Sequence, residues 1–245
     1  MQRAHLTEID STNLEAVRRW RVSDQAHPFL ITATVQTAGR GRHDRPWQSP
    51  PGGLWLTVAW PLRRPPAHYT AVPLAAGAAI ALALEETCGV RPQIKWPNDV
   101  LIAGRKVAGV LVQMELAADQ PAAIVGVGLN GNFAAADLGP DLLYPATSLQ
   151  DELGRPVDLD AVLAAAVGQL EALLVAYDRD GPAACLPDVR SRLAWLGEQV
   201  RAQLITGGPP VVGRIAGLAD DGSLLLDAGD RQHRVSAGEI ARLRP

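Results

Sequence analysis

The sequence predicts an α+β protein with two domains, a larger one over residues 1–195 and a smaller one over residues 196–245. Three observations support this. Short runs rich in Val, Ile and Leu alternate with turn residues, as in strands. Two long alanine-rich segments have the composition of buried helices. Beyond residue 198 the chain changes to short segments separated by Gly, Pro and Asp, which is typical of a small antiparallel barrel or sandwich.

The first predicted helix begins at residue 12, where Thr12 and Glu15 have the spacing of a capping box. Strands are expected over residues 29–35 and 53–60, and a buried helix over residues 69–88. The next segment predicts three strands, one starting at residue 93 and the last covering residues 106–115. Pro97, Asn98 and Asp99 form the first turn between them and Gly104 the second. A further buried strand is expected over residues 121–130.

Two more helices are expected before the chain changes character. Residues 157–177 are strongly apolar and rich in alanine, and Asp158 is a suitable N-cap for a helix there. Residues 182–195 are expected to form one more helix. In the small C-terminal domain we identify no group of residues with a chemical role.

Composition excludes several classes of protein. A net charge of −3 and a pI near 5.9 argue against a surface that binds nucleic acid as a whole. We find no run of the apolar length that spans a bilayer and no apolar signal core, so we expect a cytoplasmic protein without a membrane partner. Cys88 and Cys185 lie far apart, and the histidines are scattered, so we expect no metal site made by the protein.

Lysine and asparagine are rare and therefore informative. The chain has two lysines, Lys95 and Lys106, against twenty-one arginines, and its four asparagines are Asn13, Asn98, Asn130 and Asn132. A compact ammonium or a side-chain amide has no equal substitute, so residues that persist in such a composition suggest specific roles. All six lie in short, motif-like segments.

Residues 36–47, which we call the arginine loop, combine Arg40, Arg42 and Arg45 with Gly39 and Gly41. Three nearby positive charges repel one another, so the segment predicts an anionic ligand. An exposed arginine-rich turn without a ligand is the alternative. Likewise, Lys95 and Lys106 flank the turns of one predicted hairpin and either face the same anion or point into solvent.

Residues 126–131 satisfy the GxGxxG expression for dinucleotide binding. That fingerprint requires a helix directly after the glycines, and the segment that follows ends too soon, at Gly139 and Pro140. We therefore interpret these glycines as sites of close backbone packing. A nicotinamide-dependent oxidoreductase would rest on this motif alone.

Three segments in order, residues 39–47, 95–99 and 104–109, preceded by Ser11, Thr12 and Asn13, resemble the biotin protein ligases. The resemblance implies a catalytic domain similar to class II aminoacyl-tRNA synthetases, a mixed sheet with flanking helices, and a small SH3-like C-terminal β-barrel. It also implies a reaction in two steps. Biotin and ATP with Mg²⁺ give biotinyl-5′-AMP and pyrophosphate, and biotin then passes to one lysine of a biotin carboxyl carrier protein.

The same resemblance implies roles for individual residues. Biotin would be bound by Ser11, Thr12, Asn13, Gln36, Gly39, Arg40, Gly41, Arg42, Lys106 and Gly109. ATP would be bound by Arg42, Arg45, Trp47, Lys95, Asn98 and Asn130. Lys106, Arg40 and Arg42 would be catalytic. Asp44 stands where the family commonly has glycine, and its carboxylate would neutralise part of the charge of the arginine loop.

Further expectations follow from the resemblance. Some relatives carry an N-terminal winged helix that binds DNA, and because this chain begins almost at Ser11 we expect a ligase that does not bind DNA, as a monomer or homodimer. We expect the arginine loop to be disordered or open without its ligand and to become ordered when the ligand binds. A lipoate or octanoate ligase on the same fold is the nearest alternative, and a non-catalytic ligand-binding module is a more distant one.

Overall fold

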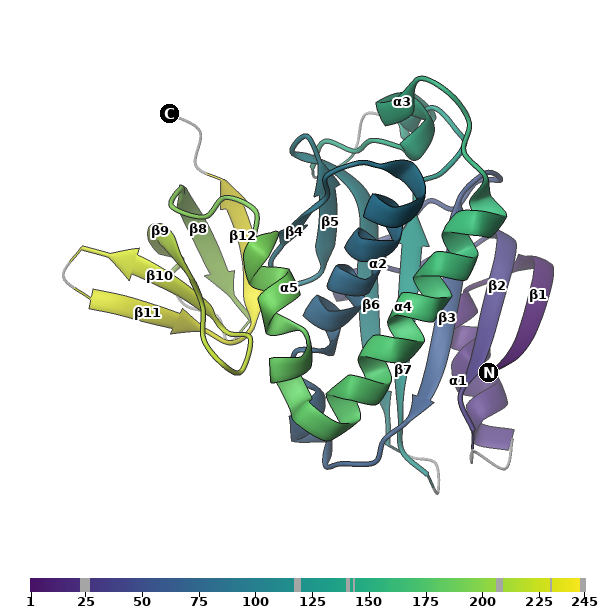
Figure 1. Ribbon diagram of the computed structural model, residues 1–245, viewed down its shortest axis with the longest axis horizontal. Coiled ribbons are helices and arrows are strands. Elements are labelled where there is room, and N and C mark those ends of the chain that lie inside the picture. Colours follow the sequence, from purple (N-terminus) through teal and green to yellow (C-terminus); the bar gives the residue numbers. More distant parts are fainter. Residues whose placement is uncertain are drawn as a thin grey trace.

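The computed structural model describes residues 1–22, 27–116, 120–139, 142, 144–205, 209–229 and 231–242. These residues form a seven-stranded sheet with helices on both faces and a five-stranded sheet beside it (Figure 1). In spatial order the larger sheet consists of β1 (Gln2–Ile9), β2 (Phe29–Gln36), β3 (Leu54–Pro61), β7 (Ala122–Leu129), β6 (Arg105–Glu115), β5 (Asp99–Ile102) and β4 (Gln93–Lys95).

The larger sheet is mixed, because β1 pairs with β2 in parallel and every other neighbouring pair is antiparallel. The strands predicted from residue 29 onward are confirmed. β1 was not predicted, because it is an edge strand whose side chains are mostly exposed and whose apolar pattern is weak.

Alternate residues of the strands serve two separate cores. Leu30 and Val58 pack under the helices α2 (Val72–Cys88) and α4 (Leu159–Asp180), which cross the front of the sheet in Figure 1. Ile31 packs instead with Trp20 of helix α1 (Thr12–Val22) on the opposite face. This period of two lets one sheet bury both of its faces.

The two long helices occur where they were predicted. Alanine-rich α2 is buried along most of its length and ends at Gly89, which adopts a left-handed conformation with φ of 66°. The carboxylate of Asp158 caps α4 by accepting hydrogen bonds from the backbone N–H groups of Asp160 and Ala161. A short helix, α3 (Leu149–Leu153), precedes α4.

The prediction of a helix over residues 182–195 is wrong in its extent. A 3₁₀ turn (Gly181–Ala184) leads into a short helix, α5 (Leu186–Ser191). The backbone then runs beside β4, where Ile94 donates to Arg192 O and Ala194 donates to Ile94 O. These hydrogen bonds to the sheet replace those that a longer helix would make.

Length and composition alone would allow two segments, Pro66–Cys88 and Leu159–Ala184, to cross a membrane. This corrects the expectation that the sequence contains no such run. Most of the first segment is buried, and α2 and α4 contribute to the core on one face of the sheet.

The smaller sheet is antiparallel and lies beside α5 and β4 (Figure 1). Its order is β11 (Arg231–Val235), β10 (Leu224–Ala228), β9 (Val211–Leu218), β8 (Gln199–Leu204) and β12 (Gly238–Arg242). The indole of Trp96 donates to Gly222 O across the boundary (3.1 Å), so the two sheets share a packed interface.

The glycines of residues 126–131 are sites of close packing, as interpreted from the sequence. They lie on and just after the central strand β7, which is antiparallel to both neighbours, so the arrangement is not a dinucleotide-binding crossover. A Cβ added to Gly126 would overlap the amide of Asn13, and one added to Gly128 would overlap the indole of Trp47.

Replacing Gly126 with alanine therefore tests this packing. We expect Gly126→Ala to lower the free energy of unfolding by about 1–3 kcal/mol, because Asn13 or the strand must shift. Gly168→Ala is the matched control, since that glycine lies on α4 with open space around it and alanine should stabilise the helix by roughly 0.5–1 kcal/mol. Urea unfolding measures both, and similar stability of the two variants would contradict the close approach.

Candidate functional site

A cavity of about 420 Å³ lies on the face of the larger sheet that carries α1, and it reaches β12 of the smaller sheet. Nearly all of the site residues expected from the resemblance line this cavity. They are Ser11, Thr12, Asn13, Gln36, Arg40, Gly41, Arg42, Arg45, Trp47, Lys95, Asn98, Lys106, Gly109 and Asn130. Gly39 does not line it. A side chain there would overlap the carbonyl of Trp47, so Gly39 permits the fold of the arginine loop itself.

One end of the cavity is a buried polar network at the start of α1. The Thr12 hydroxyl donates to Gln36 Oε1 (3.0 Å), and the Thr57 hydroxyl reaches both Thr12 Oγ1 (2.8 Å) and Asn13 Oδ1 (2.6 Å). The capping-box prediction is therefore wrong, because Thr12 bonds to neighbouring strands and Glu15 pairs with arginines of its own helix. Thr57 lies on β3 and was not identified from the sequence.

The two lysines meet at one carboxylate. Lys106 Nζ lies 2.5 Å from Asp99 Oδ1, and Lys95 Nζ lies 3.4 Å from Asp99 Oδ2. The pKa of Lys95 lies below its ordinary value, mainly because the side chain is buried; Asp99 raises it and Lys106 lowers it further. Both lysines thus face the cavity, as one of the two sequence alternatives predicted, and the anion between them belongs to the protein.

An indole ring forms part of the floor beside Lys106. Trp47 packs over Gly109 and Gly128, which are register partners on β6 and β7 and leave room for the ring. Lys106 Nζ lies 5.0 Å from the centroid of this ring. Side chains on these two glycines would fill the space that Trp47 and Lys106 occupy.

Two polar atoms of the cavity lining are buried without a hydrogen-bond partner among the described residues. They are the donor Trp47 Nε1 and the acceptor Asn130 Oδ1. Thr147 Oγ1, which lies nearby, is also buried without a hydrogen-bond partner among the described residues. The amide nitrogen of Asn130 donates to Thr147 O (2.9 Å), which fixes the orientation of the side chain. Unpaired buried polar atoms are uncommon in folded proteins, and at a cavity they favour contacts with a ligand.

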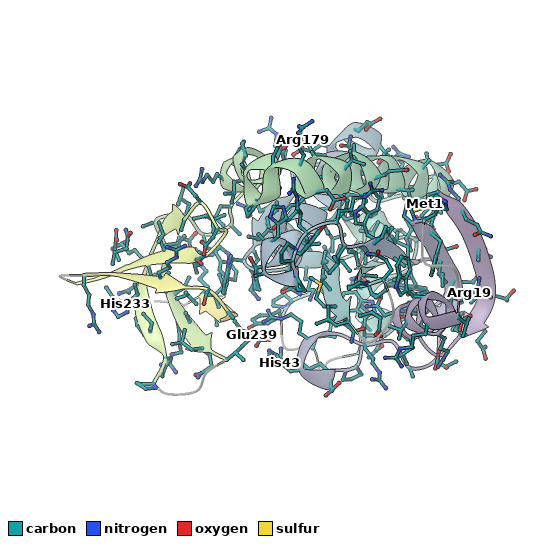
Figure 2. The ribbon with its side chains drawn as sticks, turned by 90° about the horizontal axis from the view of Figure 1, so that it is seen from below. Met1, Arg19, His43, Arg179, His233 and Glu239 are labelled. Atoms are coloured by element: carbon teal, nitrogen blue, oxygen red, sulfur yellow. The ribbon has the colours of Figure 1, made fainter. Side chains whose placement is uncertain are left out.

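The smaller domain contributes to the site, although no residues with a chemical role were identified there from the sequence. Arg45 donates both terminal nitrogens to Glu239 of β12 (2.9 and 2.8 Å), and His43 lies 3.5 Å from the same carboxylate. Figure 2 shows His43 and Glu239 together where the two domains meet. Arg42 donates to Gly238 O (3.0 Å) and to Asn98 Oδ1 (3.2 Å).

These charged groups shift one another's pKa values. Burial lowers the pKa of Arg42, against the opposing effect of Glu239 and Asp99. Burial alone would raise the pKa of Glu239, but hydrogen bonds from Arg45 and the charge of Arg42 hold that pKa below its ordinary value. Glu239 is therefore ionised at neutral pH and neutralises part of the arginine loop.

Asp44 does not have the role expected of it. The ion pairs of the described residues do not include Asp44, and the acid that meets the loop arginines is Glu239. His43 and Asp44 both have positive φ, 56° and 55°. Glycine adopts this conformation freely and Asp tolerates it, so the backbone here would also accept the glycine expected from the resemblance.

Metal binding by the protein alone finds no support in the described residues, which contain no group of three or more His, Cys, Asp or Glu side chains able to hold an ion. The carboxylates that line the cavity, Asp99 and Glu239, are already paired with lysines and arginines.

Removing the charge of Glu239 should loosen the arginine loop. We expect Glu239→Gln to speed tryptic cleavage after Arg40 and Arg42 by up to about fivefold, because Arg45 loses a partly exposed ion pair. Peptide mass spectrometry identifies the cut sites. Glu198→Gln removes a different ion pair of the smaller domain, with Arg242, and should leave these cuts unchanged. Equal cleavage of the loop in both variants would show that Glu239 does not restrain it.

Comparison with known proteins agrees with this arrangement. The sequence profile of the Biotin/lipoate A/B protein ligase family matches residues 6–130, and that of the Biotin protein ligase C terminal domain matches residues 195–243. The chain is 34% identical to the biotin--[acetyl-CoA-carboxylase] ligase of Mycobacterium tuberculosis over 98% of this chain and 88% of that protein. It is 35% identical to the enzyme of the same name from Paracoccus denitrificans over 96% of this chain and 98% of that one.

Solved structures resemble it over the whole chain. The biotin protein ligase of Aquifex aeolicus in complex with biotin and ATP has a TM-score of 0.83 and 27% identity, covering 100% of this chain and 99% of that one. The similarity therefore includes both the larger and the smaller sheet. The chain belongs to the Biotin/lipoate A/B protein ligase family and carries the C-terminal domain of the biotin protein ligases.

Proposed function

We propose that this protein is an ATP-dependent biotin protein ligase, which activates biotin as biotinyl-5′-AMP and transfers it to a lysine of a biotin carboxyl carrier protein. One observation carries the proposal. The cations of three separate segments, the arginine loop, Lys95 and Lys106, meet at a single cavity whose other end is neutral and polar. Relatives of the chain over nearly its full length are named as biotin ligases.

Biotin is expected at the neutral end, near Thr12, Asn13 and Gln36. The ring of biotin carries a urea group, which needs both donors and acceptors. Hydroxyl and amide groups supply both, and the network with Thr57 holds them in fixed orientations. The cavity is narrow at this end, because Gly126 has no side chain and Asn13 lies close to strand β7.

The phosphates of ATP are expected at the cationic end. In the first step the biotin carboxylate attacks the α-phosphorus and the bond to pyrophosphate breaks. In the second, the amine of an acceptor lysine attacks the activated carbonyl carbon, and AMP leaves. The protein needs only to position the reactants and stabilise charge, so Lys106, Arg40 and Arg42 act electrostatically.

Adenine is expected between Trp47 and Asn130. The unpaired Asn130 Oδ1 accepts a hydrogen bond, which suits the exocyclic amine of adenine, and the indole offers an apolar face. Mg²⁺ fits this proposal as an ion carried by the phosphates and water, with few ligands from the protein.

Lipoate or octanoate ligation is the nearest competing function, because the matched family includes both kinds of enzyme. The C-terminal domain match and the names of the relatives favour biotin. An oxidoreductase based on residues 126–131 is not favoured, since Asn13 and Trp47 cover Gly126 and Gly128. A binding module without catalysis would need Lys106 displaced from the cavity, and Lys106 lines it.

We propose further that the larger domain, residues 1–195, is of the class II synthetase type and that residues 196–245 form an SH3-like barrel. The mixed sheet with helices on both faces and the five-stranded antiparallel sheet support these proposals. Cytoplasmic location, the lack of operator binding, and a monomeric or homodimeric state remain predictions from the sequence.

Pyrophosphate release tests the proposed function. With ATP we expect release that requires biotin, and Lys106→Ala should slow it by about 100- to 1,000-fold through loss of transition-state stabilisation. Arg179→Ala, which removes an exposed cation paired with Asp180, should retain the wild-type rate. Comparable release with lipoate or octanoate in place of biotin, or release without any acid, would contradict the proposal.

A further inference from the structure

Lys95 is enclosed by aromatic side chains from outside the recognised motifs. Its side chain is only 5% exposed, and its ammonium lies 3.3 Å from the centroid of the Tyr144 ring and 5.6 Å from that of Trp195. Tyr144 lies in the segment before α3, and Trp195 lies just before the smaller domain. Lys95 therefore has aromatic neighbours from two parts of the chain that are far from it in sequence.

Asp99 alone compensates the charge of Lys95 incompletely. The carboxylate is shared with Lys106, which takes the shorter contact, 2.5 Å against 3.4 Å. The pKa of Lys95 is lowered chiefly by burial, and the charge of Lys106 lowers it further. A protonated Lys95 thus needs a further source of negative potential, and the face of an aromatic ring supplies one.

The position of Tyr144 suits this role. The ring lines the same cavity as Lys95, and the hydroxyl donates to Ile240 O of β12 at 3.5 Å. The ring is thus held between the larger domain and the strand that carries Glu239. The hydroxyl contact is long and weak, so the two parts of the side chain contribute differently and can be tested separately.

We propose that Tyr144 is a positioning residue of the nucleotide site, whose ring holds the protonated ammonium of Lys95 facing the phosphates of ATP. The proposal rests on the proposed function, because it takes the nucleotide to be bound at this end of the cavity. Tyr144 acts through Lys95 and need not touch the reacting atoms.

Nucleotide binding without turnover tests the proposal. Calorimetric titration with α,β-methylene-ATP, and separately with biotin, should show that Tyr144→Leu weakens nucleotide binding by roughly 5- to 30-fold and leaves the biotin affinity unchanged. Tyr144→Phe keeps the ring and loses only the hydroxyl, so it should bind the nucleotide with nearly wild-type affinity. Thermal unfolding checks that the variants are folded, and Tyr144→Met replaces the leucine variant if that one is not.

Measuring nucleotide binding by Tyr144→Leu in the Lys95→Met background shows whether Tyr144 acts through Lys95 or weakens binding in some other way. If Tyr144 acts through Lys95, Tyr144→Leu should cause little additional loss of nucleotide affinity in Lys95→Met. Full additivity of the two substitutions, or equal weakening by Phe and Leu, would overturn the proposal. Because the readout is binding, it stays decisive even if biotin-dependent pyrophosphate release, the test of the proposed function, fails.

Discussion

The carboxylate of Asp99 lies between the two lysines of the chain, and the arrangement of the cationic end of the cavity depends on it. Without an anion, two ammonium groups so close together would repel and one would lose its proton. Asp99 holds both on the cavity before any phosphate arrives. Glu239 does the same for Arg45, so each group of cations has a carboxylate partner within the protein. A bound nucleotide, with several charged oxygens, can then share or displace these partners.

The sheet supplies the rigid part of the site, and the segments between strands supply its charges. Glycines on β6 and β7 let Asn13, Trp47 and Lys106 approach the strands closely, which fixes the depth of the cavity. The arginine loop reaches across this floor and meets β12 of the smaller domain through Arg42 and Arg45. The smaller domain thus helps to set the position of the loop, and a movement of that domain would change the charges that a ligand meets.

Local patterns predicted most of the fold, and all but one of the site residues named from the resemblance line the cavity. Alternating apolar residues marked the strands from β2 onward, and Asp158 marked the start of α4, because these signals lie within a few neighbouring residues. The contacts that were missed join residues far apart in sequence. Three such pairs are Glu239 with Arg45, Thr57 with Thr12, and Tyr144 with Lys95. A pattern of neighbouring residues does not indicate contacts of this kind. The capping box failed for the same reason, since a tertiary partner took the Thr12 hydroxyl.

We propose that this cavity joins biotin to the α-phosphate of ATP and that the biotin then passes to a carrier protein. The most direct measurement is to incubate the protein with biotin and ATP labelled at the α-phosphate, remove free nucleotide by gel filtration, and identify the bound label by chromatography. We expect biotinyl-5′-AMP bound to the protein, and its loss, with labelled AMP released, when an unmodified biotin carrier protein is added. Labelled ATP or AMP alone on the protein, with no adenylate of biotin, would contradict it.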